Sequence, residues 1–480
     1  MAEPNPRETG VIRTLFAQNW LTVFGASLTT ASFILIAALV VVGALGGVDS
    51  PYIGIVAFLI LPGMFVVGLI IIPVGALWQR WRLRQAAGAA EALTIDLRRR
   101  HTRRALGLLF FLTAANLFII SSVTYRGVLY MDSVEFCGKV CHTVMEPEHT
   151  AFLNSPHGRV HCVECHIGPG APWFVRSKLS GARQVFAVMF RTYSTPIPTP
   201  VENLRPSRDT CEQCHWPQKF SGDRMKVTKE FSEDETNTRL TTALLMHIGG
   251  GHSDTHGIHS WHIAPGRETY YLPTSEDRQT LSLVRVKEPD GVIKNFATPD
   301  FQGDPATVPN EQMRLMDCID CHNRPTHVYQ LPGDAMDEAM TAARIDPALP
   351  SIKQVGVEAL QAAAEAPTQE AGIEQIAQRI KQYYQENHSD ALTAQSGALD
   401  AAIKEMQAIY QRNVFPQMKV TWGTYPNNIG HEPFPGCFRC HDETHATADG
   451  DTISQDCTIC HAVLAWQEPE PEVLTTLGIQ

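Results

Sequence analysis

The chain consists of an N-terminal part with long uncharged apolar runs and a longer remainder in which polar and charged positions are frequent. The apolar runs cover residues 21–47, 52–77 and 106–123 and contain mainly Leu, Ile, Val, Phe, Ala and Gly. Uncharged runs of about 18 residues or more are long enough to cross a bilayer as helices. From about residue 131 onward no apolar run reaches that length. The pattern predicts three transmembrane helices within residues 1–130, followed by a large water-soluble part.

The charges around these runs predict the orientation of the chain in the membrane. Residues 78–105, between the second and third runs, carry eight arginines against only Glu91 and Asp96. Arginine and lysine accumulate on the cytoplasmic side of membrane proteins, so we expect a cytoplasmic loop there. The third helix then leaves the lipid bilayer on the outer face of a bacterial inner membrane, and residues 131–480 lie in the periplasm. The formal net charge of −11 disfavours nucleic acid as a partner.

We expect three blocks beyond the membrane part. In residues 221–335 the alternating LSLVRVK precedes a Pro-Asp-Gly turn in KEPDGVIKNF, which predicts a small β hairpin. In residues 336–480 the stretch from 351 to 412 has helical spacing with breaks at AEAPTQEAG and SDALTAQSG, which predicts two or three helices. Residues 131–220 form the block next to the membrane. The expected fold is membrane-anchored and mainly α, with little regular structure outside these elements.

Twelve cysteines form six close pairs, and the second cysteine of every pair is followed by histidine. Five pairs have the spacing C-x-x-C-H, the attachment motif of c-type heme, in which two thiols bond to the porphyrin and the histidine binds the iron. The first pair, in FCGKVCHTVMEPEHT, has one residue more, and we interpret it as a widened variant. The sequence predicts six covalently bound hemes c, numbered here in chain order, on Cys137 and Cys141, Cys162 and Cys165, Cys211 and Cys214, Cys318 and Cys321, Cys437 and Cys440, and Cys457 and Cys460.

Two other uses of paired cysteines are less compatible with this pattern. A zinc site joins two pairs of ligands around one metal and does not need histidine after every cysteine pair. A disulfide framework does not involve histidine at all. With hemes 1–3 in residues 131–220, heme 4 in residues 221–335 and hemes 5 and 6 in residues 336–480, porphyrins replace much of the apolar core, which explains the low content of regular structure.

Each iron has room for a second axial ligand beside its attachment histidine. The attachment histidines are His142, His166, His215, His322, His441 and His461. Twelve other histidines follow residue 131, and His388 among them lies in a polar helical stretch. The remaining eleven are a surplus that favours two-histidine coordination, which blocks small ligands and leaves electron transfer as the function of the iron. Met145 is a candidate thioether ligand of the first iron, or packs against its porphyrin. The histidines we expect as distal ligands are His157, His247, His259, His262, His327 and His431.

The membrane anchor followed by FCGKVCHTVMEPE, SPHGRVHCVECHIGPG and SKLSGARQVF resembles the NapC/NirT family of membrane-anchored multiheme quinol dehydrogenases, best over residues 105–220. The resemblance implies a quinol site at the membrane beside the first heme. It also implies that His157 is a distal ligand, that Lys178 approaches the quinol, and that Met145 is the methionine near heme 1. The chain departs from the family in its three spans, six attachment sites and widened first motif, and the family's acidic residue after the lysine has no clear counterpart.

These features predict a quinol dehydrogenase that passes electrons from the membrane quinone pool along the hemes to periplasmic or outer-membrane redox proteins, either cytochromes or a reductase. Lys178 is expected to bind the quinol oxygen, and Glu146 and Glu148 are expected to accept protons. Two alternatives remain open. The chain is a passive electron-transfer subunit whose spans bind a larger membrane complex, or a terminal reductase of nitrogen oxyanions with an open iron.

Overall fold

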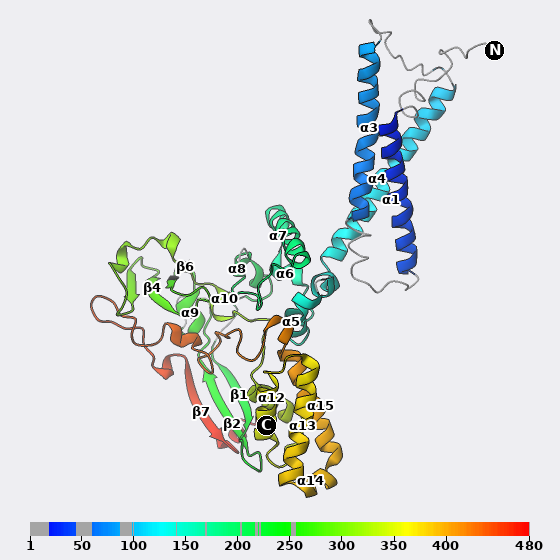
Figure 1. The fold of residues 1–480 in the computed structure, drawn as a ribbon. Helices are drawn as coiled ribbons and strands as arrows, with labels where there is room; N and C mark the ends of the chain where they lie inside the picture. Colours follow the sequence, from blue (N-terminus) through cyan, green and yellow to red (C-terminus); the bar gives the residue numbers. More distant parts are fainter. Residues whose placement is uncertain are drawn as a thin grey trace, which may run out of the picture. The chain divides into compact units, whose positions relative to one another are not determined.

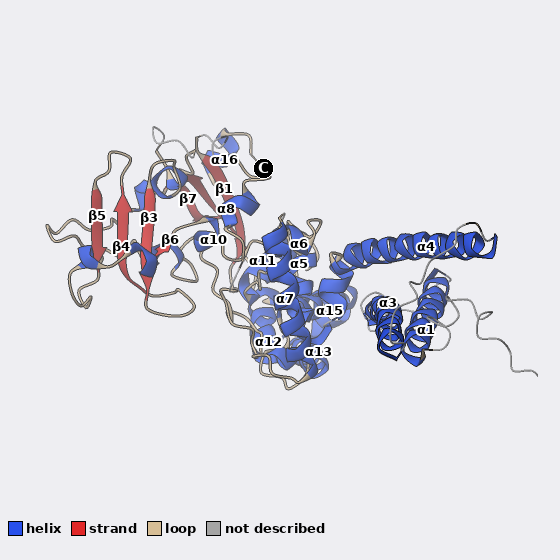
Figure 2. Cartoon of the chain, turned by 90° about the horizontal axis from the view of Figure 1, so that it is seen from above, coloured by secondary structure: helices blue, strands red, loops and turns tan. Residues whose placement is uncertain are grey.

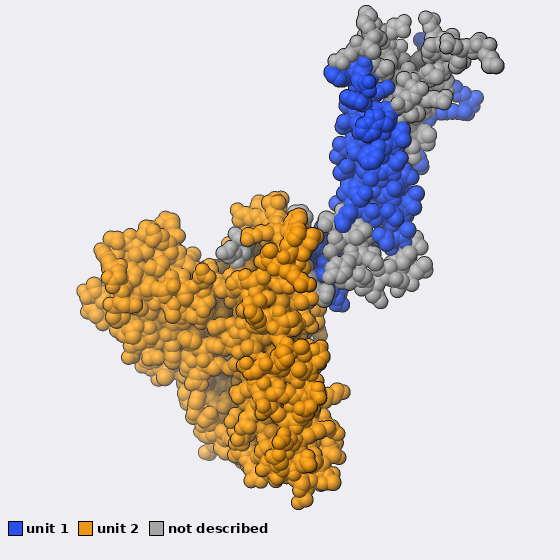
Figure 3. Space-filling view, in the orientation of Figure 1, with its two compact units in different colours: residues 1–140 blue, residues 141–480 orange. Residues whose placement is uncertain are grey.

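The computed structural model divides into two compact units, residues 1–140 and 141–480, which Figure 3 distinguishes by colour. Each unit is described by itself. The first unit contains membrane-type helices, and the second contains the five C-x-x-C-H motifs. The residues that the structure describes are 19–44, 60–86, 98, 100–140, 142–168, 170–201, 204–216, 219, 222–250 and 256–479.

In the first unit, α1 (Trp20–Ala44) and α3 (Leu61–Ala86) lie side by side (Figure 1). Small residues permit this approach, because a Cβ atom added to Gly25 would lie 2.9 Å from the carbonyl oxygen of Gly68. Asn19 donates its side-chain amide to the carbonyl oxygen of Gly75 across the pair. Within the described residues, two stretches are long and apolar enough to cross a membrane, Trp20–Leu39 and Leu61–Gln79.

The structure does not confirm the third predicted span. Residues 106–123 lie within the long helix α4 (Arg100–Met131), but this helix does not pass the length and apolarity test that α1 and α3 pass. The third span therefore stays a prediction. Parts of the other predictions, residues 45–47, residues 52–59 and much of the arginine-rich loop, lie outside the described residues.

The second unit contains more sheet than the predicted hairpin. That hairpin is present as β4 (Leu281–Lys287) and β5 (Ile293–Ala297), within a four-stranded sheet of order β5-β4-β3-β6 (Figure 2). A second antiparallel sheet has the order β1-β2-β7, and its third strand follows the last cysteine motif directly. This strand was missed because it pairs with a segment over 200 residues earlier, a partner that local periodicity does not reveal. The remaining strands are β1 (Arg224–Phe231), β2 (Arg239–Met246), β3 (Glu268–Pro273), β6 (Arg314–Leu315) and β7 (His461–Glu468).

A helical region, residues 332–413, holds the largest apolar core. Its helices break where the sequence predicts, between α12 and α13 at AEAPTQEAG and around α14 at SDALTAQSG, although there are more of them than expected. Side chains at helical spacing, among them Leu360, Ile376 and Met406, are fully buried in one cluster. The helices are α11 (Pro332–Thr341), α12 (Ile352–Ala363), α13 (Gln369–Asn387), α14 (Ser389–Ala394) and α15 (Ser396–Asn413).

The cysteine motifs lie on short turns in the rest of the second unit, which we call the motif region (residues 142–331 and 414–480). Two longer helices accompany them near the start of the unit, α5 (His142–Leu153) and α7 (Ala171–Met189). A short helix, α16, covers Glu472–Thr476. The turns on which the motifs begin or lie are α6 (Cys162–His166), α8 (Ser207–Cys211), α10 (Cys318–Cys321), η8 (Gly436–Arg439) and η9 (Cys457–Ile459). A further short helix, α9 (Ile258–His262), carries His259 and His262.

Candidate functional site

Each C-x-x-C-H motif begins or lies on one turn of α- or 3-10-helix. In α10, for example, Asp317 caps the helix at Cys318 and Asp320 completes a reciprocal capping box. One helical turn brings residues three apart to the same side, so both thiols face one way and the following histidine stays close to them. This local geometry suits attachment of one porphyrin by two thioether bonds.

The later motifs follow one another in space in their chain order. The thiol of Cys165 lies near that of Cys211, and the thiol of Cys211 shares a hydrogen bond with that of Cys318. Further along, burial and the neighbouring Cys437 raise the pKa of Cys321 to about 11, and Cys437 also neighbours Cys460. In the heme-loaded protein these sulfur atoms would be thioethers bonded to the porphyrins. Their sequence of contacts describes a row of sites from heme 2 to heme 6.

Five histidines expected as distal ligands lie opposite five attachment histidines. Each pair joins residues from different elements, and the two rings stand apart by nearly the same distance in every case. The pairs, with the distances between ring centroids, are His166 and His327 (6.2 Å), His215 and His157 (6.0 Å), His322 and His259 (6.4 Å), His441 and His262 (6.0 Å), and His461 and His431 (6.3 Å).

This separation fits one iron between two imidazoles. A metal–nitrogen bond of about 2.0 Å on each side, with each ring centroid about 1.1 Å behind its nitrogen, places the centroids about 6.2 Å apart. The ring orientation agrees, because Nδ1 of His157 lies 3.1 Å from the Pro325 carbonyl oxygen and Nδ1 of His262 lies 2.6 Å from that of Ile258. With Nδ1 used in a hydrogen bond, Nε2 is left for the metal. The residues present therefore fit bis-histidine heme at five sites.

Two other expected ligands have no such pairing in the part of the chain that is described. His247 directs Nδ1 to the carboxylate of Asp223 at 2.9 Å, beside the last heme site. Met145 lies half-buried on α5. Cys141 and the side chain of His142 lie outside the described residues, so the ligation of the first iron stays a prediction.

The widened first motif coincides with a change in helix type. Residues Phe136–Val140 form a π-helix, in which hydrogen bonds run from residue i to i+5. A π-helix has about 4.4 residues per turn, so it absorbs one residue more per turn than an α-helix does. The additional residue per turn matches the one residue by which the first motif is longer than C-x-x-C-H.

The three residues expected at a quinol site occupy two helices. Lys178 lies half-buried on α7, and Glu146 lies on α5, where its carboxylate accepts a hydrogen bond of 2.9 Å from the side-chain amide of Gln417. Glu148 lies deeper on α5, with a carboxylate oxygen 3.0 Å from Nδ1 of His327. Burial raises the pKa of Glu148, but contact with His327 and the charge of Arg324 outweigh it, and the net pKa lies below its usual value.

Sequence reasoning did not identify the exposed apolar face of α7. Val175, Leu179, Phe186 and Met189 recur at helical spacing, and all are exposed. On the same helix the guanidinium of Arg176 lies over the ring of Trp173. The spacing of the apolar residues was a readable signal. An apolar face with basic residues beside it is typical of a helix at a membrane surface.

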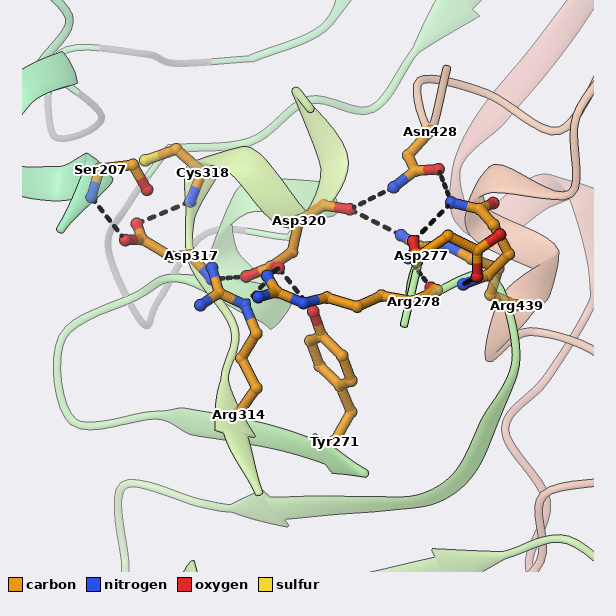
Figure 4. Close-up of polar contacts among 11 residues, drawn as sticks. Ser207, Tyr271, Asp277, Arg278, Arg314, Asp317, Cys318, Asp320, Asn428 and Arg439 are labelled. Carbon is orange, nitrogen blue, oxygen red and sulfur yellow. Dashed lines mark hydrogen bonds and ion pairs between the residues drawn. The ribbon is translucent and has the colours of Figure 1, made fainter. Parts of the chain in front are cut away.

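Sequence reasoning also missed a polar cluster around Asp320, the residue between Cys318 and Cys321 (Figure 4). The buried carboxylate of Asp320 accepts hydrogen bonds of 2.6 Å from the hydroxyl of Tyr271 and from Nε of Arg314. Burial and this carboxylate raise the pKa of Tyr271, which therefore remains a donor.

Two further polar groups, one on the α10 turn and one at its cap, join this turn to the neighbouring heme sites. The carbonyl oxygen of Asp320 accepts a hydrogen bond of 2.6 Å from Arg439, which stands between Cys437 and Cys440. On the other side, the carboxylate of Asp317 accepts the backbone N–H of Ser207 at the start of α8. These contacts tie the third, fourth and fifth attachment sites to one another.

Comparison with known proteins agrees with this reading. The family model "NapC/NirT cytochrome c family, N-terminal region" matches residues 99–199. The chain is 42% identical over 456 residues to the cytochrome c-type protein ImcH of Geobacter sulfurreducens, covering 93% of this chain and 88% of that protein. The chain belongs to the NapC/NirT cytochrome c family. No solved structure matches it.

Membership makes the chain a multiheme cytochrome of the c type with covalently bound heme, and the two apolar helices α1 and α3 agree with a membrane anchor. Members of this family are quinol-linked redox proteins. The resemblance stated from FCGKVCHTVMEPE and the motifs after it is therefore confirmed. The eleven described cysteines are all free of disulfides, and no group of three or more His, Cys, Asp or Glu among the described residues is arranged to hold a bare metal ion.

Proposed function

We propose that this protein is a membrane-bound hexaheme cytochrome c that oxidises quinol at the periplasmic face of the membrane and passes the electrons outward along its hemes. The observation that carries the proposal is the set of five histidine pairs with centroid distances of 6.0 to 6.4 Å. Two-histidine irons have no open position for a substrate, so these five sites transfer electrons and do not bind oxyanions. This argues against a terminal reductase.

In this proposal the motif region holds the hemes at fixed distances from one another, so that electrons can pass from each heme to the next. The hydrogen bonds from Arg439 to Asp320 and from Ser207 to Asp317 hold neighbouring attachment turns together, so the distances between hemes 3, 4 and 5 change little during turnover. Electrons enter at heme 1 and leave from the region of heme 6, whose attachment histidine begins the edge strand β7. A periplasmic or outer-membrane redox protein accepts them there.

The quinol site belongs to the start of the second unit. Lys178 donates a hydrogen bond to a quinol oxygen, which lowers the cost of removing the quinol proton. Glu146 is the better placed of the two glutamates to receive that proton, since its carboxylate lies at the surface, where the amide of Gln417 donates a hydrogen bond to it. The apolar face of α7 rests on the lipid surface, where the quinone pool is accessible.

The reaction balances as one quinol giving one quinone, two electrons and two protons. Covalently bound heme supplies the one-electron steps when present. The chain's own groups hold the quinol oxygen through Lys178 and carry protons to the periplasm through Glu146. Because the protons and the electrons both leave the quinol on the periplasmic side, no net charge crosses the bilayer, and the reaction should not respond to the electrical membrane potential.

The test is the substitution Lys178→Ala in the full-length, heme-loaded protein. We expect heme reduction by a quinol to slow by roughly 10- to 100-fold, the usual contribution of positioned proton-transfer groups. Reduction by dithionite and the heme content should not change. Lys381→Ala is the matched control, because Lys381 is an exposed lysine on α13 that pairs with Asp400.

Two results would contradict the proposal at different levels. Unchanged quinol kinetics in Lys178→Ala would remove that residue from the site. A wild-type protein that dithionite reduces but quinols do not would instead support the alternative, a passive electron-transfer subunit of a larger membrane complex.

A further inference from the structure

A buried cluster of polar groups lies behind the distal histidine of heme 2. Nδ1 of His327 is 3.0 Å from the backbone carbonyl oxygen of Glu148 and 3.0 Å from its carboxylate oxygen Oε2. The Nδ1–H group hydrogen-bonds to the neutral carbonyl oxygen, and the charged carboxylate oxygen lies beside it at the same distance. The inference below rests on the proposed ligation of heme 2 by His166 and His327.

We propose that Glu148 is a positioning residue for this ligand, which fixes the ring plane of His327 and lowers the reduction potential of heme 2. The carbonyl oxygen accepts the hydrogen bond that fixes the Nδ1–H tautomer, which leaves Nε2 as the nitrogen that would bind the iron, and the carboxylate adds a negative charge beside the ring. The carboxylate makes the imidazole a stronger donor. A stronger donor favours the oxidised, more positive iron over the reduced form.

The groups around Glu148 leave the negative charge of its carboxylate only weakly screened. The Glu148 side chain is 17% exposed and that of Arg324 is 8% exposed, so water screens the carboxylate weakly. Arg324 is its nearest cation, but the guanidinium lies 4.0 Å away and stacks at 4.2 Å on the ring of Tyr425. His327 is thus the closer partner of the carboxylate. The apolar cluster containing Val144, Tyr329 and Tyr425 encloses the group.

Other paired histidines in the described residues differ from His327. His157 and His262 direct Nδ1 to the neutral carbonyl oxygens of Pro325 and Ile258. A carboxylate at this position distinguishes heme 2 from hemes 3 and 5 although all three have the same pair of ligands. Glu148 also lies on α5, six residues after His142, so one helix carries both the attachment histidine of heme 1 and the group that adjusts heme 2.

The experiment is a redox titration of the full-length, heme-loaded protein, followed by visible and electron paramagnetic resonance spectra. Glu148→Gln keeps the side-chain shape and the backbone carbonyl but removes the charge. We expect one of the six components to move upward by about 59 mV, which corresponds to a tenfold change in its equilibrium constant for one electron. The low-spin signal of one heme should also change its g values, because the ring of His327 is held less firmly.

The matched control is Glu405→Gln. Glu405 is 16% exposed and pairs with Arg344 and Arg412, so the control removes the same charge at the same burial from the helical region. It should leave all six components in place. Glu148→Asp keeps the charge but withdraws the carboxylate by one methylene, and should give a smaller upward shift.

Three results would overturn the proposal. The first is a Glu148→Gln titration that superimposes on the wild type, and the second is an equal shift in Glu405→Gln. The third is loss of heme in both Glu148 variants, which would make the residue a requirement for assembly and not for tuning. None of these depends on quinol. A wild-type spectrum in which heme 2 is high-spin would instead contradict the proposed ligation itself.

Discussion

The helical region and the motif region are parts of one compact unit, yet they are held together in different ways. In the helical region one cluster of 23 buried residues, 22 of them from residues 335–414, forms a continuous apolar core. The largest cluster that lies wholly within the motif region has seven members. There, histidine rings stand about 6 Å apart across gaps that suit porphyrins. The helical region carries its own core, and the motif region depends on its cofactors to complete one.

The difference shows what each region is for. A helical bundle with its own core gives a stable support whose stability does not depend on heme. The motif region uses polar contacts, such as those of Asp320 with Arg314 and Tyr271, to fix short turns that apolar packing alone would not hold. Substitutions in the two regions should therefore act on different observables.

The largest effect is expected from removing one site in the middle of the row. Cys318→Ala with Cys321→Ala takes away heme 4, which lies between the third and fifth sites. Intact mass should fall by one heme, and quinol-driven reduction of the last two hemes should nearly stop in stopped-flow absorbance measurements. Circular dichroism should retain the helical signal, because the core around Leu360 is separate. Fast reduction of all remaining hemes would show that electrons do not follow the row.

Removal of one distal histidine should change the ligation of one iron while all six hemes stay attached. His157→Ala leaves the iron of His215 with one protein ligand, so we expect one high-spin heme in the resonance spectrum of the oxidised protein. His247→Ala is the control, since its ring lies against Asp223, and should leave the spin state of every heme as it is in the wild type. The opposite outcome, a high-spin heme in His247→Ala alone, would require the ligands to be reassigned.

A core substitution should affect the helical region alone. Leu360→Ala removes a fully buried side chain and should cost about 2–5 kcal/mol of unfolding free energy in urea titrations. Gln361→Ala, on the exposed side of the same helix, should change stability by less than about 0.5 kcal/mol. Heme spectra should be identical in both. A change in heme spin state in Leu360→Ala would mean that the two regions are not separable.

The smallest effect concerns a surface carboxylate of the helical region. A hydrogen bond from Gln330 lowers the pKa of Glu338, and Arg344 adds to this against the opposing effect of partial burial. The folded-state pKa is below the unfolded one, so the stabilisation is present above the unfolded pKa and is lost as pH falls through the folded one. Glu338→Gln should cost less than about 1 kcal/mol at pH 7, and the cost should shrink as the pH falls through the folded pKa. A difference independent of pH would contradict this.

Local patterns predicted the parts of this molecule that depend on neighbouring residues. The motifs, the hairpin β4–β5 and the helix breaks could all be read in the sequence, because turn residues and periodicity act over a few positions. The surplus of histidines also indicated two-histidine coordination. Which histidine faces which motif was not, since His327 reaches a site that begins at Cys162, and nothing local encodes that contact.

The same limit explains the residues that sequence reasoning missed or left open. Asp320 is a variable position within a motif, and its partners Tyr271 and Arg439 come from segments 49 and 119 residues away. Glu148 was predicted from its closeness to the first motif as a proton acceptor. Its contact with His327, 179 residues later, suggests the other role proposed above.

The central claim is that six attachment sites carry hemes and that five of them have two histidine ligands. The most direct measurement is the intact mass of the purified full-length protein together with the electron paramagnetic resonance spectrum of its oxidised form. The account predicts a mass of the polypeptide plus six hemes, with low-spin signals from at least five. A mass that corresponds to fewer hemes, or high-spin signals from two or more, would contradict it.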